Sequence, residues 1–447
     1  MDEMKKQECK NIDLPEGFKI TELGPLPEDW QVVRLGDELI EQKQKNRNEQ
    51  SLPVYTISNV YGFILSDEFF EKQVYSRNLT NYKIVEKGDF AYNPYRVNVG
   101  SLALFRGDNP GLVSPAYTVF RVRSSDRLDP DFLLMLFKSS SLRSEIDRVA
   151  MSRGSVRRSL AYKDLSDFHI PLPPLPEQRA IAHVLRTVQR AKEATERVIQ
   201  ATQELKKSLM YYLFTYGPVP MEEAERVPLK ETEIGLVPEH WDVVKLGDVA
   251  KTASGGTPSR KNPEYFGGKI HWVKSGELND SLVSCTEETL TEMGIINSNA
   301  RVFPKGTLLI AMYGATAGKV GILECEAASN QAVCAVFPQK ILSSNFLFYV
   351  FMYRRSKLLS ERYGGAQPNI SQTVIKAFNI PLPPLHEQHE IVRILQAVDK
   401  KLQAEEARKQ ALEELFKTLL YNLMTGKIRV KDVVLPNVGE GKGDVTH

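Results

Sequence analysis

Length, composition and charge first limit the class of protein. The chain has 447 residues, of which 42% are hydrophobic and 26% are charged, and this composition is typical of an ordinary soluble globular protein with two or more cores. The formal net charge of +2 argues against a uniformly basic nucleic-acid coat protein, although it permits basic patches that acidic faces balance elsewhere.

Cysteine and hydropathy patterns exclude further classes. The four cysteines form no CxxC pair and have no histidines near them at zinc-ligand spacing, so we expect neither a metal site nor a disulfide framework. No apolar run in the sequence approaches the ~20 residues that span a bilayer. The N-terminus also lacks the apolar core of a signal peptide, and we therefore expect a cytoplasmic protein.

In chain order, the first recognisable element is a segment that occurs twice. Residues 21–37 read TELGPLPEDWQVVRLGD and residues 232–248 read TEIGLVPEHWDVVKLGD, so that Trp30 corresponds to Trp241 after a shift of 211. Similarity at this period indicates an internal duplication. A repeat that serves stability alone is one interpretation. Because the sequences between the repeated segments differ, we favour two related modules with different tasks.

Each opening segment is followed by an interior rich in short strands. Runs typical of strands, bounded by glycine, proline and asparagine turns, occur at 53–58, 101–105, 116–122, 307–313 and 332–337. Helical patterns follow late in each interior, at 129–147 and 343–363. This succession predicts two mixed α/β modules.

Basic and amide side chains distinguish the two interiors. Residues 143–163 contain six lysine or arginine residues and form a candidate phosphate-binding edge. The matching stretch 362–372, RYGGAQPNISQ, offers amides instead, which suit base edges because Gln and Asn can pair bidentately with adenine. For each stretch, a solvated loop is the alternative interpretation.

Each module ends in a second repeated segment that leads into a long helix. IPLPPLPEQ at 170–178 recurs as IPLPPLHEQ at 380–388, and apolar residues then follow at spacings of three and four, the pattern of an amphipathic, heptad-like seam. Prolines suit the helix entries, and Gly217 and Gly426 suit the exits. We expect helices of ~37 residues, ~55 Å long, packed on each other as an antiparallel pair. The alternative is that each helix lies on its own module.

Three motifs resemble chemical sites without completing them. NPYR at Asn93 lacks the second proline of the Asn-Pro-Pro-aromatic loop of adenine methyltransferases, and no glycine-rich turn for a methyl donor accompanies it. GATAGKV at 314–320 has three residues between glycines where a phosphate loop has four, and Val320 replaces the magnesium-binding Ser or Thr, which favours a tight strand turn. The histidines at 386 and 389 favour a surface helix turn. We predict no catalytic constellation.

We call the two opening segments and the two proline segments with their helices the repeated frame. With this frame, the chain resembles the specificity subunit of type I restriction–modification systems. The resemblance is carried by the two opening segments, the two proline segments, SGGTPSRKNPEYFGGKIHWVKSGEL at 254–278 and GGAQPNIS at 364–371. It covers nearly the whole chain, except about twenty residues at each end.

The resemblance implies an architecture. It is a mixed α/β (α+β) fold with two target-recognition domains, each reading one half of a split DNA sequence, separated by two long helices that pack as an antiparallel coiled coil with pseudo-two-fold internal symmetry. The expected segments are 19–172 for the first target-recognition domain, 173–216 for the first spacer helix, 217–231 for a linker, 232–382 for the second target-recognition domain, 383–426 for the second spacer helix and 427–447 for a C-terminal tail.

The resemblance also implies partners. A subunit of this kind has no catalysis of its own. It binds double-stranded DNA and recruits two modification subunits, which methylate adenine from S-adenosylmethionine, and motor-nuclease restriction subunits, which use ATP and magnesium. We expect no cofactor, no metal and no membrane on this chain. A stand-alone DNA methyltransferase or nuclease with an unrecognised site is the main alternative, and a coiled-coil adaptor with protein-binding modules is another.

Site residues follow from the matched motifs as hypotheses. The first DNA edge is assigned to Arg153, Arg157 and Arg158, with reading loops at Asn93, Arg96 and Asn98. The second is assigned to Ser259, Arg260, Lys261, Tyr313, Lys319, Gln367 and Asn369. Gln367 and Asn369 are the best candidates for base readers. Glu277 stands where many members of the family place Asp, which leaves the role of that turn open.

Overall fold

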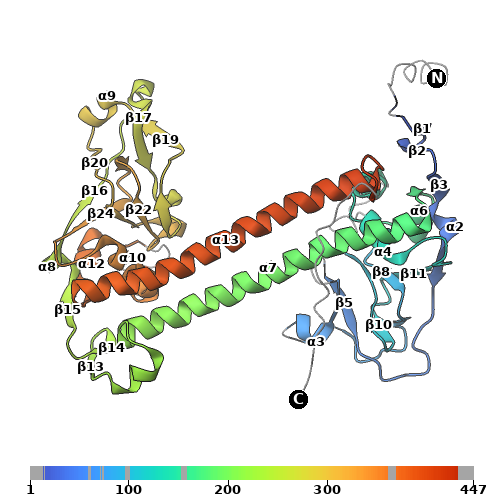
Figure 1. The fold of residues 1–447 in the computed structure, drawn as a ribbon, viewed down its shortest axis with the longest axis horizontal. Coiled ribbons are helices and arrows are strands. Elements are labelled where there is room, and N and C mark those ends of the chain that lie inside the picture. Colours follow the sequence, from blue (N-terminus) through green and yellow to red (C-terminus); the bar gives the residue numbers. More distant parts are fainter. Residues whose placement is uncertain are drawn as a thin grey trace. The chain divides into compact units, whose positions relative to one another are not determined.

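The computed structural model describes residues 14, 16–58, 62–70, 72, 75–95, 101–152, 159–360 and 369–430. The chain divides into two compact units. Unit 1 holds the described residues up to 194 and from 408, and unit 2 holds residues 195–407. Each unit combines one mixed α/β domain with a segment of both long helices, α7 (Leu175–Tyr216) and α13 (Leu385–Met424) (Figure 1). Among the described residues, no helix has the length and apolar character needed to cross a membrane.

Unit 1 is built around an antiparallel sheet with strand order β4-β11-β8-β9. Its strands are β4 (Leu39–Gln42), β8 (Asp89–Tyr92), β9 (Leu102–Leu104) and β11 (Thr118–Val122). Two-stranded pairs flank this sheet: β1 (Phe18–Thr21) with β2 (Gly24–Pro27), β3 (Gln31–Arg34) with β12 (His169–Leu172), β5 (Tyr55–Ser58) with β6 (Gly62–Leu65), and β7 (Lys83–Val85) with β10 (Gly111–Val113).

Short helices close the core of unit 1. They are α2 (Leu35–Glu38), α3 (Ser66–Phe69), α4 (Pro130–Leu136), α5 (Ser140–Ser152) and α6 (Tyr162–Ser166). The side chain of Asp129 accepts the backbone N–H of Phe132 at 2.9 Å and so caps α4, as an N-terminal aspartate typically does. On the sheet, the rings of Phe90 and Phe120 stack at 5.1 Å between centroids, and both side chains are fully buried.

Unit 2 contains a larger sheet with strand order β16-β24-β21-β22-β18. Its strands are β16 (Ala250–Ser254), β18 (Ser281–Val283), β21 (Leu308–Ala311), β22 (Val320–Leu323) and β24 (Val333–Pro338). A second sheet joins β17 (Phe266–Val273), β19 (Glu288–Leu290), β20 (Val302–Phe303) and β23 (Ala327–Ser329). The paired strands outside these sheets are β13 (Leu229–Thr232) with β14 (Gly235–Pro238), and β15 (Asp242–Lys245) with β25 (Asn379–Leu382).

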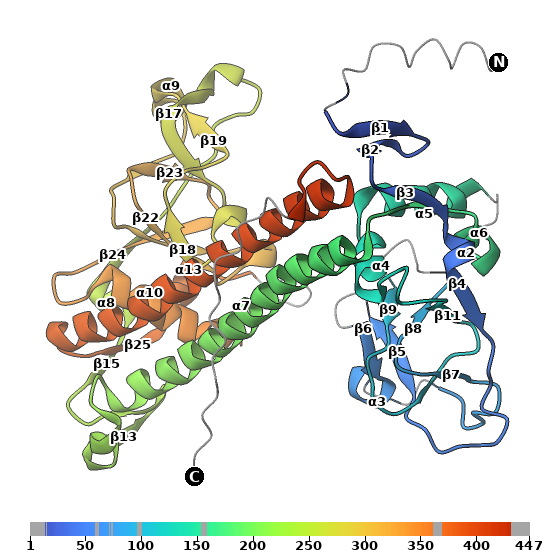
Figure 2. The same cartoon turned by 45° about the vertical axis from the view of Figure 1, so that its right-hand side comes forward.

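The helices of unit 2 pack mainly between the larger sheet and the long helices. They are α8 (Leu246–Val249), α9 (Glu292–Ile296), α10 (Ser344–Tyr353), α11 (Arg355–Ser360) and α12 (Gln372–Ala377), with the 3-10 turns η3 (Met221–Arg226), η4 (Pro263–Tyr265), η5 (Ser275–Glu277) and η6 (Gly314–Thr316). Six of the ten residues of helix α10 are buried in the core. In both ribbon views, α9, β17 and β19 form the part of this unit farthest from the long helices (Figure 2).

The two sheets preserve the duplication that the sequence predicts. Strands β4, β11, β8 and β9 of unit 1 correspond in order and antiparallel pairing to β16, β24, β21 and β22 of unit 2. Unit 2 then adds β18, which pairs with β22 in parallel, and its second sheet. The predicted mixed α/β class and internal repeat are therefore confirmed, and the interiors differ by added strands as well as by sequence.

Both long helices contribute to both cores. In unit 1, Ile181 and Leu185 near the start of α7 are buried in one cluster with Leu423 near the end of α13. In unit 2, Leu213 near the end of α7 is buried with Ile391 near the start of α13. The predicted antiparallel pairing is confirmed within each unit, and the alternative in which each helix lies only on its own module is wrong. The helices have 42 and 40 residues, longer than expected, because each begins directly after its proline pair.

The repeated proline segments end in a glutamine that ties the domain to the helix. Gln178 is fully buried. Its Oε1 accepts the backbone N–H of Asp129 at 2.9 Å, and its Nε2 donates to the carbonyls of Arg127 at 3.0 Å and Pro173 at 2.8 Å. Gln388 repeats this pattern in unit 2, with the N–H of Ser343 at 2.9 Å and the carbonyls of Ile341 at 2.9 Å and Pro383 at 2.8 Å. The repeated letters therefore encode one structural joint, made twice.

The glutamate before each glutamine anchors the buried tryptophan of the opening segment. The indole N–H of Trp30 donates to Glu177 at 3.0 Å, and that of Trp241 donates to Glu387 at 2.8 Å. Both indoles are fully buried, and a buried indole N–H requires such a partner. Opening segment and helix entry thus interlock, which explains why both are repeated.

Candidate nucleic-acid interface

In unit 2, loops from distant parts of the chain meet at one edge of the larger sheet. Strands β16 and β21 end there and β24 begins there, because Ser254 pairs with Cys334 and Ala311 pairs with Val333. The end of the GGAQPNIS motif reaches the same edge, since the N–H of Ile370 donates to the carbonyl of Met312 at 2.8 Å.

Polar side chains concentrate at this edge, which we call the polar edge. It is defined by Thr257, Asn279, Tyr313, Lys319, Gln331 and Asn369. Lys319 donates from Nζ to Asn279 Oδ1 at 3.1 Å, and the Thr257 hydroxyl bonds to Gln331 Oε1. Five of the six are exposed, and Lys319 is half-buried. The structure therefore brings together Tyr313, Lys319 and Asn369, three of the residues that the sequence analysis assigned to the second reading surface.

The residues 314–320 form a turn rather than a phosphate loop. The N–H of Gly318 donates to the carbonyl of Ala311 at 2.8 Å, and Gly314 and Gly318 have φ angles of 79° and 78°. These left-handed conformations are easy for glycine and strained for other residues. The predicted tight strand turn is confirmed, and it places Tyr313 and Lys319 on its two sides.

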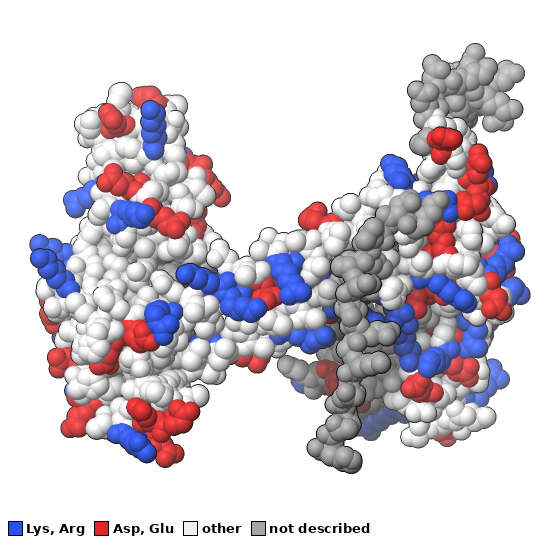
Figure 3. Space-filling model, in the orientation of Figure 1, with Lys and Arg blue, Asp and Glu red and all other residues white. Residues whose placement is uncertain are grey.

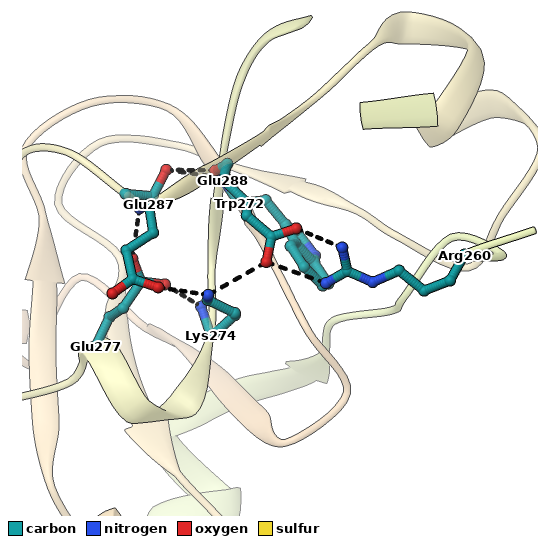
Figure 4. Close-up of polar contacts among 7 residues, drawn as sticks. Arg260, Trp272, Lys274, Glu277, Glu287 and Glu288 are labelled. Atoms are coloured by element: carbon teal, nitrogen blue, oxygen red, sulfur yellow. Dashed lines mark hydrogen bonds and ion pairs between the residues drawn. The ribbon is translucent and has the colours of Figure 1, made fainter. Parts of the chain in front are cut away.

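Arg260 lies in an ion-pair network instead of standing free (Figure 4). Its guanidinium binds Glu288 through two contacts of 2.5 and 3.1 Å and lies 4.4 Å from the centroid of the Phe266 ring. Lys274 joins the same network at 3.2 Å from Glu288 and 2.6 Å from Glu287. The hydrogen bonds from Arg260 hold the pKa of the Glu288 carboxyl below its ordinary value, against the opposing effect of burial.

A DNA phosphate at Arg260 would therefore compete with Glu288. The guanidinium has five N–H donors and its side chain is 57% exposed, so donors remain for a second acceptor. Its neighbours Ser259 and Lys261 are exposed, and the Ser259 hydroxyl accepts the N–H of Lys261 at 3.4 Å. The assignment of these three residues to DNA stays a prediction.

The structure defines the role of Glu277. Its carboxylate accepts the backbone N–H of Lys274 at 2.7 Å and that of Glu287 at 2.8 Å, so it closes η5 and ties this turn to the residue directly before β19 (Figure 4). A carboxylate at this position serves the backbone, and both of its oxygens are engaged. The turn that sequence analysis left open is therefore a structural support beneath Lys274.

In unit 1, the corresponding strand ends form a second edge. Asn93 follows β8, its backbone N–H donates to Ser101 at 3.1 Å, and its Oδ1 accepts the N–H of Tyr95 at 3.0 Å. The N–H of Leu160 donates to the carbonyl of Pro94 at 3.0 Å, as Ile370 does to Met312 in unit 2. Among the described residues, the amide N–H₂ of Asn93 has no hydrogen-bond partner. Arg96, Asn98, Arg153, Arg157, Arg158 and Gln367 lie outside the described residues.

Three lysines at this edge were missed by sequence analysis, and we call them the basic edge. The backbones of Lys45 and Lys83 form an isolated antiparallel β-bridge, and Lys43 follows directly after β4. Burial, and then the charges of Lys45 and Lys43, lower the pKa of Lys83, against the opposing effect of Glu41. The three residues are separated by up to forty positions in the sequence, so only the strand pairing reveals that they gather. Lys43 is paired with Glu41 at 2.8 Å.

The described residues contain no cluster of three or more His, Cys, Asp or Glu residues that could hold a metal ion. On the face shown in Figure 3, basic and acidic side chains are intermixed over both units. This mixture is consistent with a net charge near zero.

The protein thus consists of two related domains that are joined to the long helices in the same way. Their strand ends present different polar side chains, and the described residues offer no metal centre. Residues 27–207 and 238–414 both match the family model of the type I restriction modification DNA specificity domain. The chain belongs to this family, and the resemblance seen in the sequence is confirmed.

Two named relatives match along nearly their whole length. The MjaVIII specificity subunit of a type I restriction enzyme from Methanocaldococcus jannaschii is 27% identical over 431 residues, covering 94% of this chain and 97% of that protein. The HindI specificity subunit from Haemophilus influenzae is 20% identical, covering 90% and 100%. A solved S subunit of a type I system from M. genitalium has 15% identity and a TM-score of 0.57, covering 92% and 98%, and shares the fold.

Proposed function

We propose that this chain is the DNA-recognition subunit of a type I restriction–modification complex, and that it reads a bipartite asymmetric target with one domain per half-site. The observation that carries this proposal is the contrast between frame and interior. The same joints seat both domains on the helices, whereas the polar edge and the basic edge present different side chains at equivalent strand ends. Two unlike edges imply two unlike half-sites.

Each segment then has a task. Residues 19–172 and 232–382 are the two target-recognition domains, residues 173–216 and 383–426 are the spacer helices, residues 217–231 are a linker and residues 427–447 are a tail. A helix of 42 residues is ~63 Å long at 1.5 Å per residue. Because half-sites read from one face lie about one helical turn of DNA apart or a multiple of it, the helix length sets the number of unread base pairs.

The two edges divide the work of recognition. Lysines of the basic edge and Lys319 contact phosphates, which fix register without reading sequence. Amides of the polar edge, with Asn93 in unit 1, reach base edges, where Gln and Asn recognise adenine through two hydrogen bonds. For Arg96, Asn98, Arg153, Arg157, Arg158 and Gln367, which lie outside the described residues, the proposed contacts with DNA rest on the sequence alone.

Catalysis belongs to the partners in this proposal. The chain itself is not an enzyme and carries no cofactor, and it recruits two modification subunits and the motor-nuclease restriction subunits in the cytoplasm. S-adenosylmethionine, ATP and magnesium act on those subunits. The names of the relatives, which are specificity subunits of type I restriction enzymes, support this division.

Matched lysine variants test the two edges. In the complex with the modification subunit, K45A and K319A should weaken binding to all DNA sequences alike and lower the slope of log K against log salt by about 0.9 each, the value for one lost phosphate contact on duplex DNA. K87A and K305A are the controls, since Lys87 and Lys305 are exposed at the opposite ends of β8 and β21.

Salt slopes that are equal for all four variants would contradict the assignment of the edges. A purified chain that transfers methyl groups or cleaves DNA without any partner would contradict the proposal of a non-catalytic subunit.

A further inference from the structure

The two copies of the repeated frame differ at one charged position. In unit 1, the guanidinium of Arg429 binds both oxygens of Glu177, with Nε at 2.6 Å and Nη2 at 2.6 Å, and both oxygens of Asp29 at 3.0 and 2.7 Å. It also lies 6.0 Å from the centroid of the Trp30 ring. Glu177, which accepts the indole N–H of Trp30, thus also forms an ion pair with Arg429.

Unit 2 has the same glutamate and indole but no corresponding arginine in its frame. His240 occupies the position of Asp29, 211 residues later, and the residues that correspond to Arg429 fall at 218–220, which read Pro-Val-Pro. Among the described residues, Glu387 pairs with His240 at 2.7 Å and with His386 at 3.9 Å. Both of these partners are charged only when protonated.

At this place unit 2 has a hollow of about 690 Å³. It is lined by Tyr216, Pro218 and Val219, where the chain leaves α7, by the carboxylates of Glu223, Glu387 and Glu390, and by Arg226, His240 and His386. The hollow is therefore found where unit 1 holds the Arg429 side chain, and it has the same glutamate in its wall.

The charges around this hollow favour a cation. Arg393 binds both oxygens of Glu390 at 2.8 and 2.6 Å, and Glu223 and Glu387 remain against Arg226, so the lining has one excess negative charge while the histidines are neutral. The last carbonyl groups of α7 point toward the same end, where the helix dipole adds negative potential. In Figure 3, acidic side chains gather at the end of unit 2 where β13 and β14 lie.

We propose that this hollow receives an arginine side chain of a second polypeptide chain, with Glu387 taking the role that Glu177 has toward Arg429. Arginine fits better than lysine because the planar guanidinium binds both oxygens of a carboxylate. That the second chain is the modification subunit rests on the proposed function. In unit 1 the site at Glu177 is thus occupied by Arg429 of the same chain, and in unit 2 the equivalent site at Glu387 is available to a partner.

Saturation-transfer NMR with the full chain tests the site itself. N-acetyl-argininamide is the probe, and N-acetyl-citrullinamide, a neutral molecule of nearly the same shape, is the matched control. We expect signal from the first probe and at least threefold less from the second. E387Q should reduce the argininamide signal at least threefold while its amide oxygen still accepts the indole N–H of Trp241, and E231Q, an exposed β13 variant outside the hollow, should not.

A second variant controls for the possibility that E387Q loses signal because it fails to fold. E223Q lies on η3 at the rim of the hollow and should reduce the signal with an unchanged melting curve. Equal signals from both probes, or from wild type, E387Q and E223Q alike, would overturn the site.

Assembly with the purified modification subunit tests the partner. E387Q should weaken it at least tenfold relative to E231Q. Unweakened assembly overturns the proposed partner arginine, whereas failure of the wild-type chain to assemble counts against the proposed function instead.

Discussion

The buried glutamine joint offers the sharpest test of how the frame is built. Q178L replaces a fully buried side chain by one of similar volume and removes its three hydrogen bonds. The N–H of Asp129 and the carbonyls of Arg127 and Pro173 then stay buried without this partner. An unpaired buried polar group costs about 1–3 kcal/mol, so we expect a loss of about 3–5 kcal/mol, partly offset by the greater burial of apolar surface.

Urea unfolding followed by circular dichroism measures this loss of free energy, and thermal unfolding measures the matching shift in melting temperature. Since 1 kcal/mol shifts the melting temperature of a 150–250-residue domain by about 2–4 °C, unit 1 should melt about 10 °C lower in Q178L. Q388L is the matched variant and should lower the transition of unit 2 by a similar amount, because its hydrogen bonds repeat those of Gln178 within 0.1 Å. Variants within about 1 kcal/mol of wild type would refute the reasoning.

Three further predictions concern spacing, reading and reactivity. Inserting one heptad at 190–200 in α7 should change the number of unread base pairs or abolish assembly, and unchanged target spacing would rule out the helix as a ruler. Q367A and Q331A should relax the methylated sequence in one half-site by about 1–3 kcal/mol of discrimination, and an unchanged sequence and affinity would remove these residues from the reading surface. Burial raises the pKa of the Cys334 thiol to about 12, so at pH 8 it should resist alkylation while the exposed Cys285 reacts. Equal labelling rates in the folded chain would contradict the buried position.

Much of the frame could be predicted from the sequence because it depends on local signals. Repeated prolines, a glycine after each helix and regular apolar spacing fix where the long helices begin and end. Gly217 and Gly426 do have positive φ angles of 81° and 68°. The predicted helical run 129–147 is instead divided, because the chain turns at Ser139, whose hydroxyl donates to the carbonyl of Leu136 at 2.6 Å. A local turn of this kind leaves little trace in the apolar periodicity.

The charged contacts could not be predicted, because they join distant residues. Arg429 reaches Asp29 across 400 positions, and Lys45 and Lys83 meet only through a β-bridge. Likewise, Arg260 was assigned to DNA from its motif, and its ion pair with Glu288 follows from the pairing of β17 with β19. Sequence located the loops of the candidate site, and the fold decides which of their side chains are engaged within the protein.

Exchange of one domain tests the central claim most directly. Residues 232–382 are replaced by the matching segment of a family member with a different target, and methylated adenines are mapped genome-wide in a host that carries the modification subunit. Without the chain, no specific methylation should appear. With the hybrid, one half of the target should change while the other half and the spacing remain. A target sequence that is unchanged, or that changes in both halves, would contradict the account of two independent recognition domains on one repeated frame.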